Sequence, residues 1–141
     1  MQSTATAVWQ GGLKGGNGAL SSASGVLADQ PYSFATRFEG AGGTNPEELI
    51  AAAHAGCFAM ALSMVLGEQG LTPERLDAEA RVTLEQVADG FAITASRLSV
   101  RGRVPGATPE AFDAAAEAAK GGCPVSKALD VEITLDARLV D

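Results

Sequence analysis

The chemistry open to this chain is limited by the residues that are scarce in it. Its 141 residues include only two cysteines, Cys57 and Cys123, and one histidine, His54. A disulfide scaffold or a structural zinc site needs more Cys and His side chains than this, so we expect no metal. Positive charge is also scarce, since ten Lys and Arg against 17 Asp and Glu give a net charge of −7. This excess repels phosphate backbones and anionic lipids, so we expect no nucleic-acid partner and no membrane partner.

The sequence also shows no signal that predicts a targeting leader or a membrane-spanning run. Residues 1–16 show no cationic stretch followed by an apolar run, so we expect neither a signal peptide nor a transit peptide. The longest mostly apolar stretch, residues 49–66, is interrupted by His54 and Gly56 and is short for a membrane span. We therefore expect a buried helix in a soluble, cytoplasmic protein.

Length and composition predict one domain over residues 1–141 with a mostly aliphatic core, because 46% of the residues are hydrophobic and only 5% are aromatic. Residues 4–38 contain short alternating runs separated by glycine turns, a pattern that predicts a small antiparallel sheet. The run 32–38 alternates in the same way, so we expect Arg37 on a strand.

The clearest helix signal is the segment 44–48, Thr-Asn-Pro-Glu-Glu. Thr or Asn can cap a helix, proline suits its first position, and two glutamates favour the positive end of the helix dipole. The apolar residues 49–66 continue this helix, which we expect to stop at Gly67 or Gly70. A helix that is apolar nearly all round must be covered on most sides.

The second half of the chain predicts further strands and helices from period-two alternation, a hairpin turn and helix caps. The predicted elements are strands 76–87 and 91–104 joined at Asp89-Gly90, a helix from 108 to about 120, a short helix from Cys123, and a strand 131–139. This order predicts an α+β domain with antiparallel sheets packed on central helices.

Cys57 and Cys123 are the candidate reactive groups. Cys57 lies in the long helix among small residues, where a free cysteine is equally well explained as a small buried hydrophobe. Cys123 follows two glycines and precedes Pro124, which places its thiol at the first turn of a helix, where the dipole favours the thiolate. A thiol peroxidase needs a thiolate, a cation that holds it ionised and a second thiol that resolves the sulfenic acid.

Other side chains leave alternatives open. Arg37 is either partly desolvated and paired or an ordinary solvent-facing arginine. His54 lies one helical turn before Cys57, so it either pairs with that thiol or packs as a buried or interface histidine. A Cys57–His54 pair would also suit a thiol hydrolase, although no oxyanion loop is evident. Met60 and Met64 are better explained as core residues than as ligands.

Three segments together resemble one known family. They are Tyr-Ser-Phe-Ala-Thr-Arg-Phe-Glu-Gly at residues 32–40, the helix start and Ala-His-Ala-Gly-Cys motif within residues 44–62, and Cys-Pro-Val-Ser-Lys-Ala-Leu at residues 123–129. The chain resembles the OsmC/Ohr family of organic hydroperoxide resistance peroxidases, and specifically its OsmC branch. The resemblance runs essentially over the full length.

The resemblance implies a thiol-dependent peroxidase that reduces organic hydroperoxides and, less well, hydrogen peroxide. It implies that Cys57 attacks the peroxide, that Cys123 forms a disulfide with it, that Arg37 stabilises the thiolate and that Glu47 is the partner of Arg37. It implies no cofactor, electrons supplied by an external dithiol or a dihydrolipoyl-type protein, and an OsmC-like intertwined homodimer with antiparallel sheets wrapped around two central helices per subunit.

Two further expectations follow. An apolar substrate pocket is expected from Phe34, Phe38, Phe58 and Met60, with His54 nearby. Glu47 and Cys57 are ten residues apart, roughly 15 Å along a straight helix, so one Arg37 side chain reaches both most easily if two subunits share a site. The alternative function is a non-enzymatic redox-sensing or binding dimer whose cysteines only report oxidation.

Overall fold

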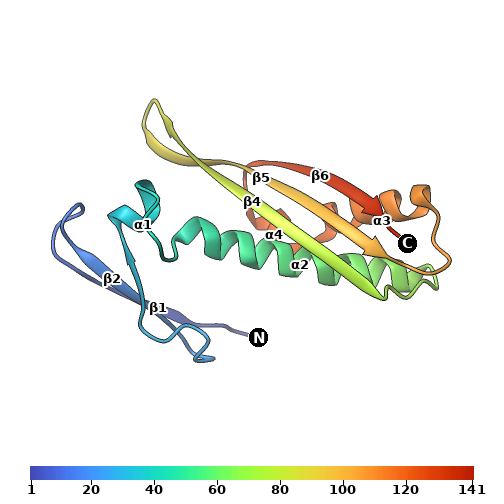
Figure 1. Ribbon diagram of the computed structural model, residues 1–141, viewed down its shortest axis with the longest axis horizontal. Helices are drawn as coiled ribbons and strands as arrows, with labels where there is room; N and C mark the ends of the chain where they lie inside the picture. Colours follow the sequence, from blue (N-terminus) through green and yellow to red (C-terminus); the bar gives the residue numbers. More distant parts are fainter. The chain divides into compact units, whose positions relative to one another are not determined.

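The chain divides into two compact units in the computed structural model, which describes residues 1–141 (Figure 1). The first unit comprises Met1–Leu49 and the second Ile50–Asp141. Together they contain two three-stranded sheets and four helices, which confirms the predicted α+β class. This division does not test whether residues 1–141 form a single domain, so the single domain remains a prediction.

The first unit is built on a small antiparallel sheet, as the sequence predicts. Its strands β1 (Ala5–Gln10), β2 (Asn17–Ser22) and β3 (Gln30–Ser33) pair in the order β1-β2-β3. Gly18 on β2 lies so close to Tyr32 and to Trp9 that a Cβ atom there would overlap their rings. A glycine at this position therefore lets the two aromatic rings approach each other, with centroids 5.5 Å apart.

The segment after β3 is a helix, α1 (Phe34–Phe38), so the prediction of a strand through residues 32–38 was wrong. Ser33 caps the helix: its side chain accepts from the Thr36 N–H, and the Thr36 hydroxyl accepts from the Ser33 N–H. This reciprocal capping box satisfies two backbone donors and outweighs the period-two pattern of the sequence. As a result Arg37 lies in the last turn of a short helix and not on a strand.

The long helix α2 (Pro46–Glu68) begins and ends close to the predicted positions. Asn45 caps it, because its Oδ1 accepts from the Glu48 N–H at 2.8 Å. The Thr44 hydroxyl donates to Glu48 Oε1 at 2.9 Å. Both contacts use the Thr-Asn-Pro-Glu-Glu signal from which the sequence predicts a helix start.

The second unit contains the predicted hairpin, with β4 (Arg75–Val87) and β5 (Gly90–Arg103) antiparallel. The helices α3 (Pro109–Gly122) and α4 (Pro124–Ala128) follow, and β6 (Glu132–Leu139) completes a sheet in the order β4-β5-β6 (Figure 1). Strand β6 runs parallel to β5, which corrects the expectation of purely antiparallel sheets. The α3–α4 crossover explains this direction, because a parallel pair needs a long connection and cannot close through a tight turn.

One hydrophobic core joins α2, β5 and α3 within the second unit. Its fully or almost fully buried members are Phe58, Leu62 and Leu66 on α2, Leu98 and Val100 on β5, and Phe112, Ala115, Ala116 and Ala119 on α3. Burial of each large apolar side chain contributes roughly 1.5–3 kcal/mol relative to leaving it exposed. This core fixes the part of α2 that carries Cys57.

The opposite face of α2 is not covered within this chain. Met60 is 77% exposed and Met64 is 62% exposed, so the prediction that they are core residues does not hold for the chain alone. By length and composition α2 could also cross a membrane, with only 22% of its most apolar window buried. The second unit alone therefore does not supply the expected cover on most sides of this helix.

Candidate active site

The two cysteines meet in the second unit although 66 residues separate them in sequence. Their sulfur atoms lie 2.8 Å apart in a thiol–thiol hydrogen bond, and both cysteines are free. Cys57 is half-buried on α2, and Cys123 is fully buried at the junction of α3 and α4. The α3–α4 turn, which Pro124 begins, thus brings the second sulfur within reach of the first.

The surroundings of the pair move the two thiol pKa values in opposite directions. Burial raises the pKa of the Cys57 thiol, and its hydrogen bond with Cys123 raises that pKa further. Burial also tends to raise the pKa of Cys123, but its hydrogen bond with Cys57 and the polar groups of Ser126 and Val125 at the start of α4 lower that pKa overall. A lowered pKa is expected for a thiol at the start of a helix.

His54 does not pair with Cys57. It is fully buried, and its two ring nitrogens contact serine hydroxyls: Nδ1 lies 2.7 Å from Ser96 Oγ and Nε2 lies 2.8 Å from Ser126 Oγ. Burial lowers the pKa of His54, so the imidazole is neutral at pH 7. The Cys57–His54 pair that a thiol hydrolase would use is absent, because both nitrogens are already engaged.

Arg37 and Glu47 form an ion pair inside the first unit. Arg37 Nη2 lies 2.8 Å from Glu47 Oε1, and Arg37 Nε donates to both carboxylate oxygens at 3.2 and 3.3 Å. The Glu47 side chain is 10% exposed and the Arg37 side chain 37%. The guanidinium also lies over the Phe38 ring, 5.2 Å from its centroid. Of the two interpretations of Arg37 from sequence, the paired, partly desolvated one is therefore correct.

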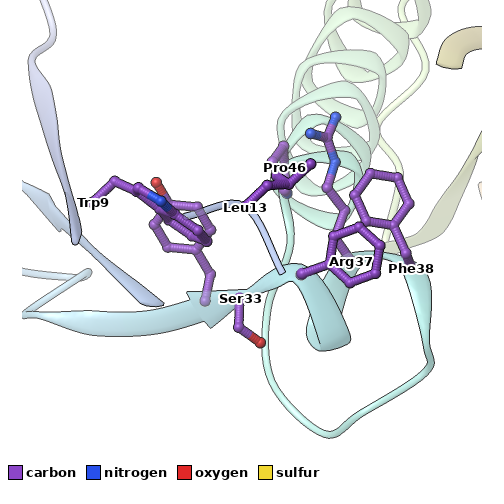
Figure 2. A pocket seen from close by; sticks show the side chains of 8 residues that line it. Trp9, Leu13, Ser33, Arg37, Phe38 and Pro46 are labelled. Carbon is purple, nitrogen blue, oxygen red and sulfur yellow. The ribbon is translucent and has the colours of Figure 1, made fainter. Parts of the chain in front are cut away.

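A hollow of about 310 Å³ in the first unit lies beside this ion pair (Figure 2). Figure 2 shows Trp9 on one side and Arg37 and Phe38 on the other, with Leu13 and Pro46 between them. The lining residues are Trp9, Leu13, Tyr32, Ser33, Phe34, Arg37, Phe38 and Pro46. The lining is mostly apolar and carries one cation, a combination that suits a ligand with a hydrocarbon part and an oxygen-rich end.

Only part of the predicted pocket lines this hollow. Phe34 and Phe38 do, whereas Phe58 and His54 are fully buried in the second unit and Met60 is exposed to solvent. Trp9, Leu13 and Tyr32 were not foreseen, because nothing in the local pattern of β1 to β3 distinguishes a pocket wall from an ordinary sheet face. Ser96 and Ser126 were also missed. No local signal could have found them, because their common partner His54 lies 42 residues from Ser96 and 72 residues from Ser126 in the sequence.

Comparison with known proteins identifies the group to which these features belong. The profile of the family described as OsmC-like protein matches residues 39–138. Peroxiredoxin OsmC of Escherichia coli is 56% identical over 131 residues, which cover 93% of this chain and 92% of that protein. The organic hydroperoxide resistance protein of Xanthomonas axonopodis pv. citri is 34% identical over 101 residues, 68% of this chain and 69% of its own.

The fold agrees with these relatives. The crystal structure of the organic hydroperoxide resistance protein OhrB of Bacillus subtilis has a TM-score of 0.72 and 32% identity, with 97% of this chain and 98% of that chain covered. An organic hydroperoxide resistance protein OsmC from Legionella pneumophila has a TM-score of 0.69 and 25% identity, covering 98% and 97%. The chain therefore belongs to the OsmC family, and it is a peroxidase of the OsmC/Ohr group.

Proposed function

We propose that this peroxidase reduces organic hydroperoxides through a Cys57 thiolate and a Cys57–Cys123 disulfide. The observation that carries the proposal is the 2.8 Å separation of the two free sulfurs, which a small local movement converts to bonding distance. Support also comes from relatives named as peroxiredoxin and as organic hydroperoxide resistance proteins.

The proposed cycle has three steps in which atoms and electrons balance. The Cys57 thiolate attacks the outer oxygen of a hydroperoxide, the O–O bond breaks, and the alkoxide takes up a proton and leaves as the alcohol. Cys123 sulfur then attacks the Cys57 sulfenic acid, the S–O bond breaks and water leaves with the proton of the Cys123 thiol. An external dithiol reduces the disulfide and is itself oxidised. No metal or cofactor takes part, because sulfur atoms carry every electron pair.

Arg37 is proposed as the cation that keeps Cys57 ionised. The groups around Cys57 in the second unit raise the pKa of its thiol, so a reactive thiolate needs a positive charge from elsewhere. Glu47 fixes the guanidinium through three N–H contacts along one edge, which leaves the edge that carries Nη1 available to an anion. The same guanidinium would stabilise the alkoxide that leaves in the first step.

The substrate class follows from the hollow beside Arg37. Its walls of Trp9, Phe34 and Phe38 offer an apolar surface to the carbon chain of an alkyl or lipid hydroperoxide. Hydrogen peroxide has no such chain and gains nothing from these walls, so it is the poorer substrate. The rings of Phe34 and Phe38 pack against each other with centroids 4.8 Å apart, and this contact restricts the motion of both side chains in the pocket wall.

A homodimer is proposed as the working form. The uncovered face of α2 presents Met60 and Met64 together with exposed small residues such as Gly56, and small residues allow a second helix to approach closely. Water contact with this face is costly, and a second copy of the chain is the simplest cover. Membrane insertion is disfavoured, because the other face of α2 packs in a protein core that includes the hydrogen-bonded His54.

A shared site follows from the dimer and from the helix geometry. Arg37 is held at Glu47, and ten residues of α2 separate Glu47 from Cys57, roughly 15 Å at the usual helical rise. We therefore propose that Arg37 of one subunit serves Cys57 of the other. Mixing inactive Cys57→Ser chains with slow Arg37→Ala chains should raise activity above that of either parent, because one of the two sites in each heterodimer is intact. Heterodimers no more active than the Arg37→Ala protein would contradict the shared site.

The electron donor is proposed to be a dithiol, with dihydrolipoyl-type proteins as candidates, and the location the cytoplasm, where free thiols such as these persist. The decisive experiment measures consumption of cumene hydroperoxide by the purified protein with excess dithiothreitol or dihydrolipoamide. Steady turnover supports the proposal, whereas a single equivalent consumed without turnover would indicate a redox sensor. Hydrolysis of esters or amides without an oxidant would instead indicate a thiol hydrolase.

A further inference from the structure

The hollow beside Arg37 gathers most of the aromatic side chains of this chain. The sequence has one tryptophan, one tyrosine and five phenylalanines, and the tryptophan, the tyrosine and two phenylalanines line this hollow of about 310 Å³. They are Trp9, Tyr32, Phe34 and Phe38. The core of the second unit is built mostly of aliphatic side chains instead. Aromatic rings are thus concentrated at the one hollow to which the proposed function assigns the substrate.

Trp9 is held in one orientation by its neighbours in the sheet. Its indole N–H donates to the Gly11 carbonyl oxygen at 2.9 Å. Trp9 pairs with Gly18 in the strand register, and a Cβ atom at Gly18 would lie 2.8 Å from the indole carbon Cε3. A Cβ atom at Gly16 would lie 2.9 Å from the indole carbon Cζ2. These two glycines therefore leave room for the indole, and a larger residue at either position would displace it.

A structural role explains only part of this arrangement. Tyr32 pairs with Gly18 from the other side, so two aromatic rings cover a glycine of the middle strand, as aromatic side chains can do in sheets. That role does not require an open hollow beside the indole. Trp9 is nevertheless 37% exposed and lines the hollow, with Arg37 and Phe38 on the opposite side (Figure 2). A ring fixed in advance beside a hollow suits binding, because little freedom is lost when a ligand arrives.

Aromatic walls distinguish one kind of carbon skeleton from another. Every apolar group, saturated or aromatic, gains from leaving water in proportion to the area that is buried. An aromatic ring gains further from edge-to-face or offset contacts with other rings, and one such contact corresponds to about two- to tenfold tighter binding. A saturated ring of the same size lacks this additional gain. The hollow therefore favours ligands that carry an aromatic ring.

We propose that Trp9 is a specificity-determining residue and that the hollow selects hydroperoxides whose carbon skeleton carries an aromatic ring. This rests on the proposed function, in which the hollow holds the carbon part of the substrate beside Arg37. The substrate ring packs against the indole, and the hydroperoxide end lies toward the guanidinium. Trp9 makes and breaks no bond, so it changes which substrate is selected and not the sulfur chemistry.

Two substrates that differ only in the ring test this selection. Cumene hydroperoxide carries a phenyl ring, and 2-cyclohexylpropan-2-yl hydroperoxide has the same carbon skeleton with the ring saturated. The ratio of their kcat/KM values cancels any change in folded fraction or in the reactivity of Cys57, because both react with the same sulfur. Trp9→Leu should lower this ratio about two- to tenfold, whereas Trp9→Phe retains a ring and should keep most of it.

Val8→Ala is the matched control for these variants. Val8 is the neighbouring residue on β1 and is 60% exposed, but it does not line the hollow. Its replacement should leave the ratio of the two kcat/KM values at the wild-type value. A loss that depends on the position of the side chain is thereby separated from a general effect on β1.

Binding can be measured without any turnover, because Trp9 is the single tryptophan of the chain and its fluorescence reports on the hollow. The product alcohol of cumene hydroperoxide, 2-phenylpropan-2-ol, is titrated into the reduced wild-type protein. It should change the Trp9 emission saturably, with a dissociation constant about two- to tenfold lower than that of 2-cyclohexylpropan-2-ol. Ring-selective binding by a protein that consumes no peroxide would refute the proposed function while supporting the role of Trp9.

Several results would overturn the proposal. They are an unchanged ratio in Trp9→Leu, a change in Val8→Ala as large as that in Trp9→Leu, equal dissociation constants for the two alcohols, or a Trp9 emission that neither alcohol alters. An unaltered emission that shifts when the protein is diluted would show that a second copy of the chain covers the hollow. Peroxide turnover with an unchanged ratio in Trp9→Leu would leave the proposed function standing and refute the role of Trp9.

Discussion

Cys57 and Cys123 occupy two helices of the same unit with their sulfur atoms 2.8 Å apart, and the thiol pKa is raised for the first and lowered for the second. In the proposed cycle the surroundings of Cys123 lower the pKa of the resolving thiol, whereas those of Cys57 raise the pKa of the attacking thiol, which would need a cation from elsewhere. This asymmetry explains why a site would need both Arg37 and a second sulfur.

Replacing Cys57 and replacing Cys123 should have different effects on peroxide consumption. Cys57→Ser should abolish peroxide consumption, because no sulfur remains to attack the O–O bond. Cys123→Ser should consume about one equivalent of peroxide and then stall, with sulfenic acid advancing to sulfinic acid under excess oxidant. Stoichiometric peroxide titration and mass spectrometry of the Cys57 peptide check this. Sustained turnover by Cys123→Ser with dithiothreitol would show that Cys123 is not required for resolution.

Arg37→Ala should slow the first step by lowering the fraction of Cys57 that is ionised. A neighbouring cation typically lowers a thiol pKa by about 1–3 units, so its loss should reduce the rate about tenfold or more at neutral pH. The rate is measured by stopped flow with one equivalent of cumene hydroperoxide, and the Cys57 pKa by alkylation. Arg75→Ala is the control, because Arg75 forms a solvent-exposed pair with Asp77 on β4. An unchanged Cys57 pKa in Arg37→Ala would remove the role assigned to Arg37.

Met60→Glu should convert the dimer to a monomer. Its side chain lies on the uncovered face of α2, where a carboxylate buried against a second copy would be unpaired. Size-exclusion chromatography with light scattering gives the mass directly. Val26→Glu is the control, since Val26 is also an exposed apolar side chain, 84% exposed, and belongs to the first unit. A wild-type chain that is monomeric at micromolar concentration would refute the dimer.

His54 should make the folded state less stable in mild acid. Burial lowers its pKa in the folded protein below the ordinary value of 6.5, so the unfolded chain binds the proton first as the pH falls. The contribution to stability is complete above pH 6.5 and is lost as the pH falls toward the folded-state pKa, by at most about 1.4 kcal/mol per pH unit. Urea unfolding at several pH values, compared between wild type and His54→Gln, isolates this effect. Parallel pH profiles for the two proteins would contradict it.

Gly102→Ala should destabilise the second unit without touching the sulfur pair. A Cβ atom at Gly102 on β5 would overlap the ring of Phe112 on α3 and lie 3.1 Å from Leu76 Cδ2. Overpacking of this kind costs about 1–3 kcal/mol, measured by urea unfolding. Gly121→Ala is the matched control, because nothing lies within 4 Å of a Cβ atom there. Equal stability of the two variants would show that α3 can shift away from β5.

The sequence predicts elements well wherever the signal is local. The start of α2 depends on five consecutive residues, and the Asp89-Gly90 turn lies inside the hairpin that it closes. The segment 34–38 was mistaken for a strand because its alternation is also local, and only the Ser33–Thr36 capping box decides against it. The parallel direction of β6 was missed because alternation carries no information about strand direction.

The candidate site shows the same difference between what the sequence predicts and what only the fold reveals. Cys57, Cys123 and the Arg37–Glu47 pair were identified through the resemblance to a family, and the contacts within each pair follow once the fold is known. The partners of His54 lie 42 and 72 residues away along the chain, at Ser96 and Ser126. No local pattern can specify such contacts, because they are made only when α2, β5 and α4 pack together.

The parallel pairing of β6 with β5 has a consequence for the order of folding. The β4–β5 hairpin can form from neighbouring residues, but β6 can join it only after the intervening α3 and α4 have been laid across the sheet. Cys123 lies within that crossover, so it reaches Cys57 among the last events of folding. The sulfur pair is therefore completed only when the α3–α4 crossover packs on α2, so formation of the Cys57–Cys123 contact reports on assembly of the second unit.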